Sequence, residues 1–384
     1  MSGGVRVYLD NSATTRPDER VIQAMSRAMA ERYFNPSSLY AQSLDVERSM
    51  DSCRKSILSS LKASNGSIVF TSGGTEADNL AILGAMGSFS SGKVLYSAGE
   101  HPAVTESCKV LSRRGFAAEE IPLTREGIVS LEALDSMLAS DTRLICLMQV
   151  NNETGAVQPL RELAALRDRL CPEAMIHADG VQGFLRQACP VSETGIDSYA
   201  LSAHKIHGPK GIGALWVSGR QRLGPILFGG GQEGALRSGT ENTPGIAGLL
   251  AAICCYPAEH RMRVMKLRLY ERIKSEIPEA QVNGPDPYSE HAADHILNLS
   301  FPPVRAETML HALEGMGVLV GNGSACSSKK KSASHVLSAM RIPPAAIESA
   351  VRFSLNPYLT EDDIDYAAEC VIRNYTLLKR FTRR

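Results

Sequence analysis

Two reactive side chains of this chain, a lysine amine and a cysteine thiol, lie in runs of small and polar residues that are typical of catalytic sites. Lys205 lies in the run SAHKIHG at 202–208, at the end of an apolar stretch, and Cys326 lies in GSACSS at 323–328. Lysine amines form Schiff bases with carbonyl cofactors, and cysteine thiolates are the strongest nucleophiles among side chains at neutral pH. Most lysines are solvated and most cysteines are small buried hydrophobes, so neither residue alone establishes a function. Together they suit chemistry that uses an amine and a thiolate in turn.

A glycine-containing turn could bind an anion. The segment TSGGTE at 71–76 lies between a predicted strand and a predicted helix, with Gly74 and Thr75 at the junction. Glycines let backbone amides approach an anion, and the amino end of a helix adds favourable partial charge. The alternative is a simple strand-to-helix turn with Thr75 as the helix N-cap. The segment lacks the Gly-Lys-Ser/Thr ending of a nucleotide P-loop, so we predict a phosphate cradle of another kind.

Polar residues at other predicted strand ends could hold a planar ring. Asp179, with Gln182 three residues later, could bind a heteroaromatic cation and a neighbouring oxygen of the same ring, although such an aspartate also forms turns. His101, before a proline, could stack on a ring or move protons. Asn152 lies in the turn-like run NNETG at 151–155, after a predicted strand. A carboxylate, an amide and a histidine beside a Schiff-base lysine are what a pyridoxal phosphate site requires.

The segments between these residues alternate between strand-like and helix-like patterns. Predicted strands cover 67–71, 93–97, 142–150, 175–178, 197–202, 212–217, 296–300 and the vicinity of 318. Predicted helices cover 21–32, 43–62, 103–113, 160–170, 260–277 and about 307–316, with others beginning at 75 and after 360. This alternation predicts an α/β fold with a mostly parallel sheet covered by helices on both faces, where ligands collect beyond the carboxyl ends of the strands. We expect a large domain at 14–257 and a smaller α+β domain at 258–384, with residues 1–13 packed on the smaller one.

Composition narrows the class of protein. The 384 residues are 43% hydrophobic, and 41 basic residues balance 41 acidic ones, which argues against a general binder of nucleic acid or membrane surfaces. The longest apolar run, 246–256, is too short to cross a bilayer. Nine cysteines occur without a Cys-x-x-Cys pair or zinc-type spacing. We therefore expect a cytoplasmic protein without a metal site.

Several motifs in order along nearly the whole chain resemble the cysteine desulfurases, which belong to the class V aminotransferases and share the fold-type I architecture of pyridoxal phosphate enzymes. The matching stretches are YLDNSATT at 8–15, FNPSS at 34–38, FTSGGTEADN at 70–79, VNNETG at 150–155, HAD at 177–179, SAHK at 202–205, RSGT at 237–240, GSAC at 323–326 and VRFSL at 351–355. The resemblance implies the same fold with pyridoxal 5′-phosphate as cofactor.

The resemblance also implies a role for each candidate residue. Lys205 would carry the Schiff base, Asp179 would pair with the pyridinium nitrogen, and His101 would stack on the ring and assist proton transfer. The other implied ligands are Gln182 and Asn152 for the ring, Gly74, Thr75, Ser202 and His204 for the phosphate, Arg352 with Asn152 for the substrate, and Thr240 for the phosphate of a neighbouring subunit in a homodimer. Arg352 would clamp a carboxylate through its planar guanidinium, the alternative being an ordinary structural ion pair.

The implied reaction converts L-cysteine to L-alanine and leaves a persulfide on Cys326. Basic residues 329–331 could raise the thiolate fraction of Cys326 or could be a solvated face. Relatives that feed iron–sulfur scaffold proteins commonly continue past the final helix. The end at 384, together with the basic residues, favours a tRNA-thiolating protein as sulfur acceptor over an iron–sulfur scaffold.

Some positions depart from the family pattern, and some alternatives stay open. Gln149 replaces a histidine, Gly180 and Val181 replace an Ala-Thr pair, and residues 321–322 replace a Ser-Ser or Ser-Thr pair. The alternatives are a true transaminase, a selenocysteine lyase and a non-catalytic interaction protein on the same scaffold.

Overall fold

The computed structural model describes residues 4–259, 261–322 and 333–381. The helices are α1 (Glu19–Glu31), α2 (Ala41–Ser60), α3 (Gly74–Met86), α4 (Pro102–Arg113), α5 (Leu131–Met137), α6 (Leu160–Leu170), α7 (Val191–Thr194), α8 (Thr243–Cys255), α9 (Met262–Glu276), α10 (Ala306–Glu314), α11 (His335–Ala339), α12 (Pro344–Glu348) and α13 (Glu361–Lys379). The strands are β1 (Val7–Leu9), β2 (Ser67–Thr71), β3 (Lys93–Ser97), β4 (Ala117–Ile121), β5 (Thr142–Cys146), β6 (Met175–Asp179), β7 (Ser198–Ser202), β8 (Gly213–Val217), β9 (Gln281–Val282), β10 (Ile296–Ser300), β11 (Val318–Val320) and β12 (Ala350–Ser354). The predicted α/β class is confirmed.

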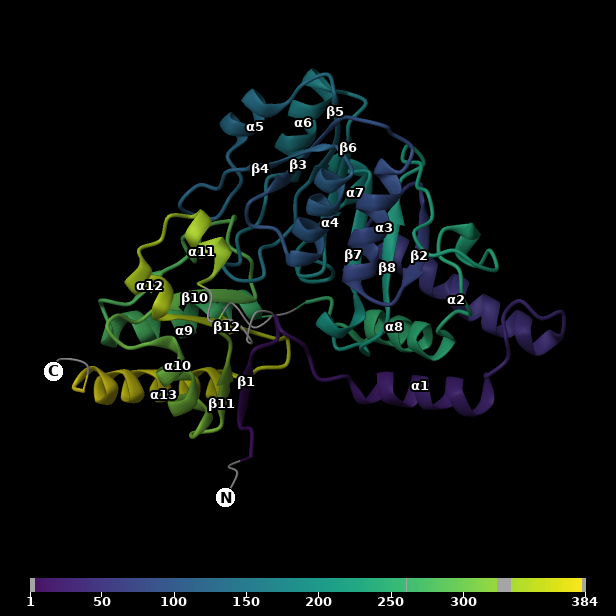
Figure 1. The fold of residues 1–384 in the computed structure, drawn as a ribbon. Coiled ribbons are helices and arrows are strands. Elements are labelled where there is room, and N and C mark those ends of the chain that lie inside the picture. Colours follow the sequence, from purple (N-terminus) through teal and green to yellow (C-terminus); the bar gives the residue numbers. More distant parts are fainter. Residues whose placement is uncertain (1–3, 260, 323–332, 382–384) are drawn as a thin grey trace.

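A seven-stranded sheet forms the centre of the larger part of the molecule (Figure 1). Its strand order is β2-β8-β7-β6-β5-β3-β4. Only β8 runs antiparallel to its neighbours, because it follows β7 without a crossover helix. The other pairs are parallel, so β2, β3, β5, β6 and β7 end at one edge of the sheet.

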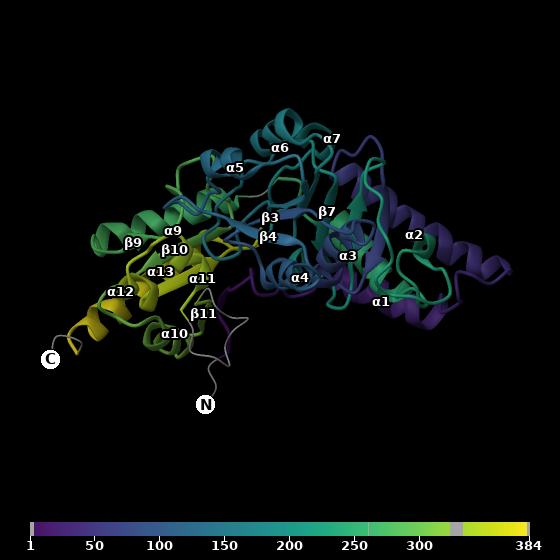
Figure 2. The same ribbon diagram turned by 45° about the horizontal axis from the view of Figure 1, so that its top comes forward.

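Helices cover both faces of this sheet, and alternate strand residues supply the two cores. Phe70 and Ile145 belong to one core, together with buried residues of α2, α6 and α8. Leu144 and Val94 face the other side, where they pack with residues of α3 and α4. The period of two is the pattern of strands buried on both faces. Figure 2 shows the helices on either side of the sheet.

The carboxyl-terminal part has its own sheet and core. Strands β12-β10-β9 form a three-stranded antiparallel sheet, and β1 pairs in parallel with β11. A second hydrophobic cluster joins α9, α10 and α13 to these strands. Asp363 and the N-cap Thr360 form a capping box that begins α13. Among the described residues, no helix is long and apolar enough to cross a membrane.

Candidate active site

A cavity of about 410 Å³ lies at the carboxyl edge of the large sheet and is lined by ten of the twelve candidate residues. They are Gly74, Thr75, His101, Asn152, Asp179, Gln182, Ser202, His204, Lys205 and Arg352. The parallel strands explain this convergence, because most of these residues follow β2, β3, β6 and β7 directly. Thr240 lines a separate hollow with Tyr33 and Phe34. Cys326 and residues 329–331 lie outside the described residues.

Lys205 is placed in the cavity wall by a single 3-10 turn that follows β7. The turn covers Ala203–Lys205. The Lys205 Nζ donates hydrogen bonds to the backbone oxygens of Ser12, at 2.5 Å, and Ala13, at 2.8 Å. The hydroxyl of Thr15 donates to the backbone oxygen of His204 at 2.9 Å. The amino-terminal segment therefore forms the wall opposite the lysine, a contact that sequence reasoning did not predict although the segment carries a family motif.

The predicted phosphate cradle is the amino end of α3. The helix begins at Gly74, after Gly73 at the N-cap, and no side chain caps it in the described chain. The alternative in which Thr75 is the N-cap is therefore wrong, because Thr75 is the second residue of the helix. A Cβ on Gly74 would lie 2.5 Å from Cγ2 of Val181, so a larger residue at this position would require the valine side chain to move. Amide groups without a side-chain cap at the start of a 13-residue helix suit an anion.

His204 completes this corner as a neutral imidazole. Burial, with a smaller effect of the Lys205 charge, lowers its pKa to about 4. Its Nδ1 lies 3.1 Å from the Thr14 hydroxyl. A neutral imidazole keeps one N–H donor, which can bind an anion without adding a full charge.

Three carboxylates are buried at the cavity: Asp78 and Asp179 line it, and Glu100 does not. Asp179 is 6% exposed, and its Oδ1 accepts a hydrogen bond from the Val181 backbone N–H at 2.9 Å, so it forms the predicted turn and also lines the cavity. Burial raises the pKa of Asp179, while nearby His101 and Lys205 oppose this shift. Burial also raises the pKa of Asp78 well above its usual value, and it raises the pKa of Glu100 to about 8. Clustered acids of this kind favour a cationic group beside them.

Asp78 was missed by the sequence reasoning, although it lies within the motif at 70–79. It lines the cavity, and its Oδ1 lies 3.1 Å from Nε2 of His177. His177 Nδ1 lies 2.9 Å from the Ser198 hydroxyl. Burial lowers the pKa of His177 to about 3, so its ring is neutral at physiological pH. The signal that could have found Asp78 is its spacing of four residues from Gly74, which places both on one face of α3.

His101 is held by its own helix. It is the N-cap of α4, and its Nδ1 accepts a hydrogen bond from the Ala103 backbone N–H at 3.1 Å. Burial lowers the pKa of His101. In the neutral ring the proton therefore lies on Nε2, since Nδ1 is an acceptor. This tautomer places the proton on the ring nitrogen that does not accept from the helix amide.

Arg352 on β12 combines an ion pair with an unpaired donor. It is 2% exposed, and its Nη2 lies 2.7 Å from Asp10 Oδ1, while Nη1 donates to the Asn152 backbone oxygen at 2.9 Å. Its buried Nε has no hydrogen-bond partner among the described residues. A buried donor that lines a cavity without a partner suits a carboxylate ligand. The structural ion pair expected as the alternative is thus present, and the guanidinium still lines the cavity.

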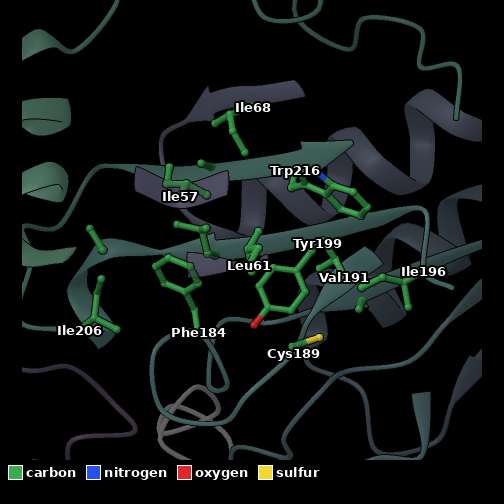
Figure 3. Packing of buried hydrophobic residues seen from close by; sticks show 14 of the residues in the cluster. Ile57, Leu61, Ile68, Phe184, Cys189, Val191, Ile196, Tyr199, Ile206 and Trp216 are labelled. Atoms are coloured by element: carbon green, nitrogen blue, oxygen red, sulfur yellow. The ribbon is translucent and has the colours of Figure 1, made fainter. Parts of the chain in front are cut away.

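Gln149 and Gly180, two positions that depart from the family pattern, both contact the Tyr199 ring or its hydroxyl. A Cβ at Gly180 would lie 1.8 Å from Cζ of Tyr199, and one at Gly183 would lie 1.8 Å from Oε1 of Gln149. The Tyr199 hydroxyl donates to that same Oε1 at 2.6 Å. Figure 3 shows Tyr199 packed in the core near Phe184. The two glycines therefore leave room for a buried tyrosine–glutamine pair behind Asp179.

The residues of the cavity fit pyridoxal phosphate. The uncapped amino end of α3 matches a phosphate, the buried acids match a protonated ring nitrogen, and Lys205, which lines the cavity, is an amine of the kind that binds a carbonyl cofactor. The unpartnered Arg352 Nε matches the carboxylate of an amino acid. Each part of the donor set is thus accounted for by one chemical group of the cofactor or its substrate.

Comparisons with known proteins agree with this chemistry. The sequence profile of the family described as "Aminotransferase class-V" matches residues 7–367. The chain is 36% identical over 374 residues to "Cysteine desulfurase IscS" of Dictyoglomus turgidum, covering 96% of this chain and 94% of that protein. It is 37% identical over 366 residues to "Cysteine desulfurase NifS" of Azotobacter vinelandii, covering 94% and 90% of the two chains. A solved structure described as a NifS-like protein superposes with a TM-score of 0.89 at 32% identity, covering 97% of this chain and 100% of that one.

Proposed function

Because this chain belongs to the class-V aminotransferase family, as a cysteine desulfurase that uses pyridoxal phosphate, we propose that Lys205 and Cys326 carry out successive steps of the desulfurase reaction. Lys205 acts on the amino acid at the cofactor, and Cys326 receives the sulfur. The substrate is L-cysteine. Its conversion to L-alanine supplies sulfur for biosynthesis, and one solved relative, at 30% identity, is described as SspA in complex with cysteine.

The residues around the cavity would hold the cofactor by its three polar parts. Pyridoxal phosphate, when bound, withdraws electrons from the α-carbon of an amino acid through its protonated ring. Asp179 keeps the ring nitrogen protonated, and Gln182 and Asn152 hydrogen-bond the ring. The phosphate ligands in this proposal are Gly74, Thr75, Ser202 and His204, joined by Thr240 of a second subunit.

Within this site, one residue binds the carboxylate of the substrate and two residues transfer protons. Arg352, with Asn152, orients the carboxylate of L-cysteine through its guanidinium. The Lys205 Nζ, once free of the cofactor, takes the proton from the substrate α-carbon. His101 carries a proton on Nε2 within the same cavity and assists its transfer.

The sulfur step uses the thiolate of Cys326. The thiolate sulfur attacks the sulfur of the substrate, a new S–S bond forms, and the C–S bond of L-cysteine breaks. The overall balance is L-cysteine plus the Cys326 thiol giving L-alanine plus the Cys326 persulfide. No external oxidant is needed, because the electron pair of the broken C–S bond stays on the substrate carbon. That carbon gains a proton and becomes the methyl group of L-alanine, so the carbon is reduced as the sulfur is oxidised to the persulfide level.

The observation that carries this proposal is the convergence of ten candidate residues from separate strand ends on one cavity. The test incubates the protein with L-cysteine and a reductant. Wild type should form alanine and sulfide in equal amounts, and Lys205→Ala should form neither and should lose the visible absorbance of the bound cofactor. Pyruvate with a pyridoxamine form of the cofactor would instead indicate a transaminase. A preference for selenocysteine is examined by the same assay with that substrate.

The proposal includes a homodimer of two-domain subunits. Thr240 lies outside its own subunit's cavity, as a residue that serves a neighbour would. Large apolar side chains are exposed near it on and after α1, including Tyr33, Leu39 and Tyr40. Separate hydrophobic cores support the division at 14–257 and 258–384, and the β1–β11 pair supports placing 1–13 on the smaller domain. Light scattering coupled to size-exclusion chromatography tests the dimer.

The proposal also includes a protein, of one of two classes, that accepts the sulfur. A tRNA-thiolating protein or an iron–sulfur scaffold would take the persulfide sulfur from Cys326. The run of basic residues 329–331 beside this cysteine favours an acceptor with an acidic face. Transfer assays with both kinds of acceptor separate the two.

A further inference from the structure

Arg186 is a buried cation behind the active-site wall that the reaction above does not use. It is 4% exposed and lies in the turn between β6 and α7. Its Nη1 donates to Gln182 Oε1 at 3.0 Å, and its Nη2 donates to the backbone oxygen of Lys205. No carboxylate forms an ion pair with Arg186 in the described parts of the chain. Burying a charge without a counter-ion costs desolvation free energy. We therefore expect the function of Arg186 to lie in the two groups to which it donates.

The contact with Gln182 determines which end of that amide faces Arg186. An arginine side chain only donates hydrogen bonds, so the Gln182 oxygen must point toward it. The Gln182 Nε2 then points away and donates to the Ser12 backbone oxygen at 2.9 Å. An amide nitrogen carries two N–H groups, and Gln182 lines the cavity, so the second N–H is available to a ligand there.

The second contact fixes the turn that carries the lysine. The Lys205 carbonyl is the last of the 3-10 turn Ala203–Lys205, and Arg186 binds it from behind the cavity wall. The turn leading to Arg186 is itself unusual, because Leu185 has a φ of 61°, in the left-handed region that leucine rarely adopts. Such a conformation persists where the surrounding contacts determine it, and here it delivers the guanidinium to both active-site residues.

Tyr256, at the end of α8, is a buried residue whose hydroxyl interacts electrostatically with Arg186. Burial raises the pKa of Tyr256, and the charge of Arg186 opposes the shift. Burial lowers the pKa of Arg186, with Tyr256 opposing. The Arg186 guanidinium therefore has a buried phenol within electrostatic range, in addition to its hydrogen bonds to Gln182 and Lys205.

We propose that Arg186 is a positioning residue for the cofactor: it holds the Gln182 amide so that an N–H, and not the oxygen, faces the cavity beside Lys205. This inference rests on the proposed cofactor role of Gln182. The Gln182 N–H would then be available to an oxygen on the cofactor ring. The nearby positive charge also disfavours proton binding at the Lys205 nitrogen.

The test compares Arg186→Met with Arg186→Lys and with the matched control Arg167→Met. Arg167 is also buried, at 2% exposed, but it binds Asp197 at 3.0 Å, and neither residue lines the cavity. The readouts are the dissociation constant of pyridoxal phosphate, the pH midpoint of the visible absorbance of the loaded protein, and the thermal midpoint. The first two report on the cofactor and would not move if Arg186 only stabilised the fold.

Arg186→Met should weaken pyridoxal phosphate binding about tenfold, the factor that matches one lost hydrogen bond of ~1.4 kcal/mol. It should also move the absorbance midpoint upward by about one pH unit, since loss of a positive charge and of a donor both favour protonation at the Lys205 nitrogen. Arg186→Lys keeps a charge and donors, so it should shift both values less. Arg167→Met should lower the thermal midpoint only.

An unchanged absorbance midpoint and cofactor affinity in Arg186→Met would overturn the inference, as would an equal shift in Arg167→Met. If Arg186→Met does not fold, Gln182→Leu and Gln182→Glu provide the same test, because each removes the amide donor while Arg186 stays. Either Gln182 variant with wild-type values overturns the inference. Failure of the proposed function looks different, because the wild type itself would then show no visible absorbance with pyridoxal phosphate.

Discussion

Replacing Gly180 by alanine would test how the site is supported from behind. The added Cβ would lie 1.8 Å from Cζ of Tyr199, so the ring must retreat by roughly 1.7 Å to reach an ordinary contact of about 3.5 Å. That movement breaks the 2.6 Å bond from the Tyr199 hydroxyl to Gln149 and the 3.2 Å bond to the Gly180 carbonyl. Overpacking costs ~1–3 kcal/mol, and a buried hydrogen-bonding group left unpaired costs a similar amount. We expect a loss of about 3 kcal/mol in total.

The assay is thermal unfolding of the wild type, Gly180→Ala, Tyr199→Leu and the double variant. At about 2–4 °C for each kcal/mol in a domain of this size, Gly180→Ala should lower the midpoint by about 6–12 °C. The double variant should be more stable than the sum of the single losses predicts, by at least about 1 kcal/mol, since Tyr199→Leu removes the clash. A Gly180→Ala protein with the wild-type midpoint, or strictly additive losses, would refute the packing argument.

Three further changes have separate readouts. Arg352→Lys keeps the charge but loses the planar fork, so the KM for L-cysteine should rise about tenfold while the visible absorbance of the cofactor stays; an unchanged KM would leave Arg352 with only its structural ion pair to Asp10. Because burial raises the pKa of Glu100 to about 8, the folded state binds this proton more tightly than the unfolded state, and stability should fall as the pH rises from about 4.5 to 8. Glu100→Gln lacks that loss, so its thermal midpoint relative to wild type should rise between pH 5 and 8, and a constant difference would contradict the assignment. Replacing residues 329–331 with alanine should leave alanine formation intact and slow sulfur transfer to a tRNA-thiolating protein at low salt, whereas equal transfer rates would remove the basic run from acceptor binding.

The sequence predicted the elements whose pattern is strong. Strands β2, β3 and β10 match the expected bounds, because each is a short, largely apolar run that is followed by a turn containing glycine or proline. The strand expected at 142–150 ends at Cys146. Its continuation at 147–150 is buried and still donates backbone hydrogen bonds to β6, from Leu147 to His177 at 3.0 Å and from Gln149 to Asp179 at 2.8 Å, but it does not continue as a regular strand. Strand β4 was not predicted, since its residues AAEEI have no strand pattern and β4 forms at the sheet edge by pairing with β3.

The residues of the candidate site could be predicted where they lie within a recognisable sequence motif. Parallel strand ends explain why residues as distant as Gly74 and Lys205 line one cavity. Contacts made by backbone groups have no sequence signal, so the Ser12 and Ala13 oxygens that accept from Lys205 could not be predicted. The same holds for Arg186, whose role depends on a left-handed Leu185 that precedes it.

The division of chemistry between amine and thiol is tested most directly by a single turnover without reductant. Wild type loaded with pyridoxal phosphate and mixed with one equivalent of L-cysteine for each subunit, so that no free thiol remains to reduce the product, should form one alanine for each subunit, together with one persulfide that mass spectrometry locates on Cys326. Cys326→Ser should keep the cofactor absorbance and its change on adding L-cysteine, because those steps use Lys205 and Arg352, yet it should form neither alanine nor persulfide. Equal alanine from the two proteins, or a persulfide on another cysteine, would contradict the account.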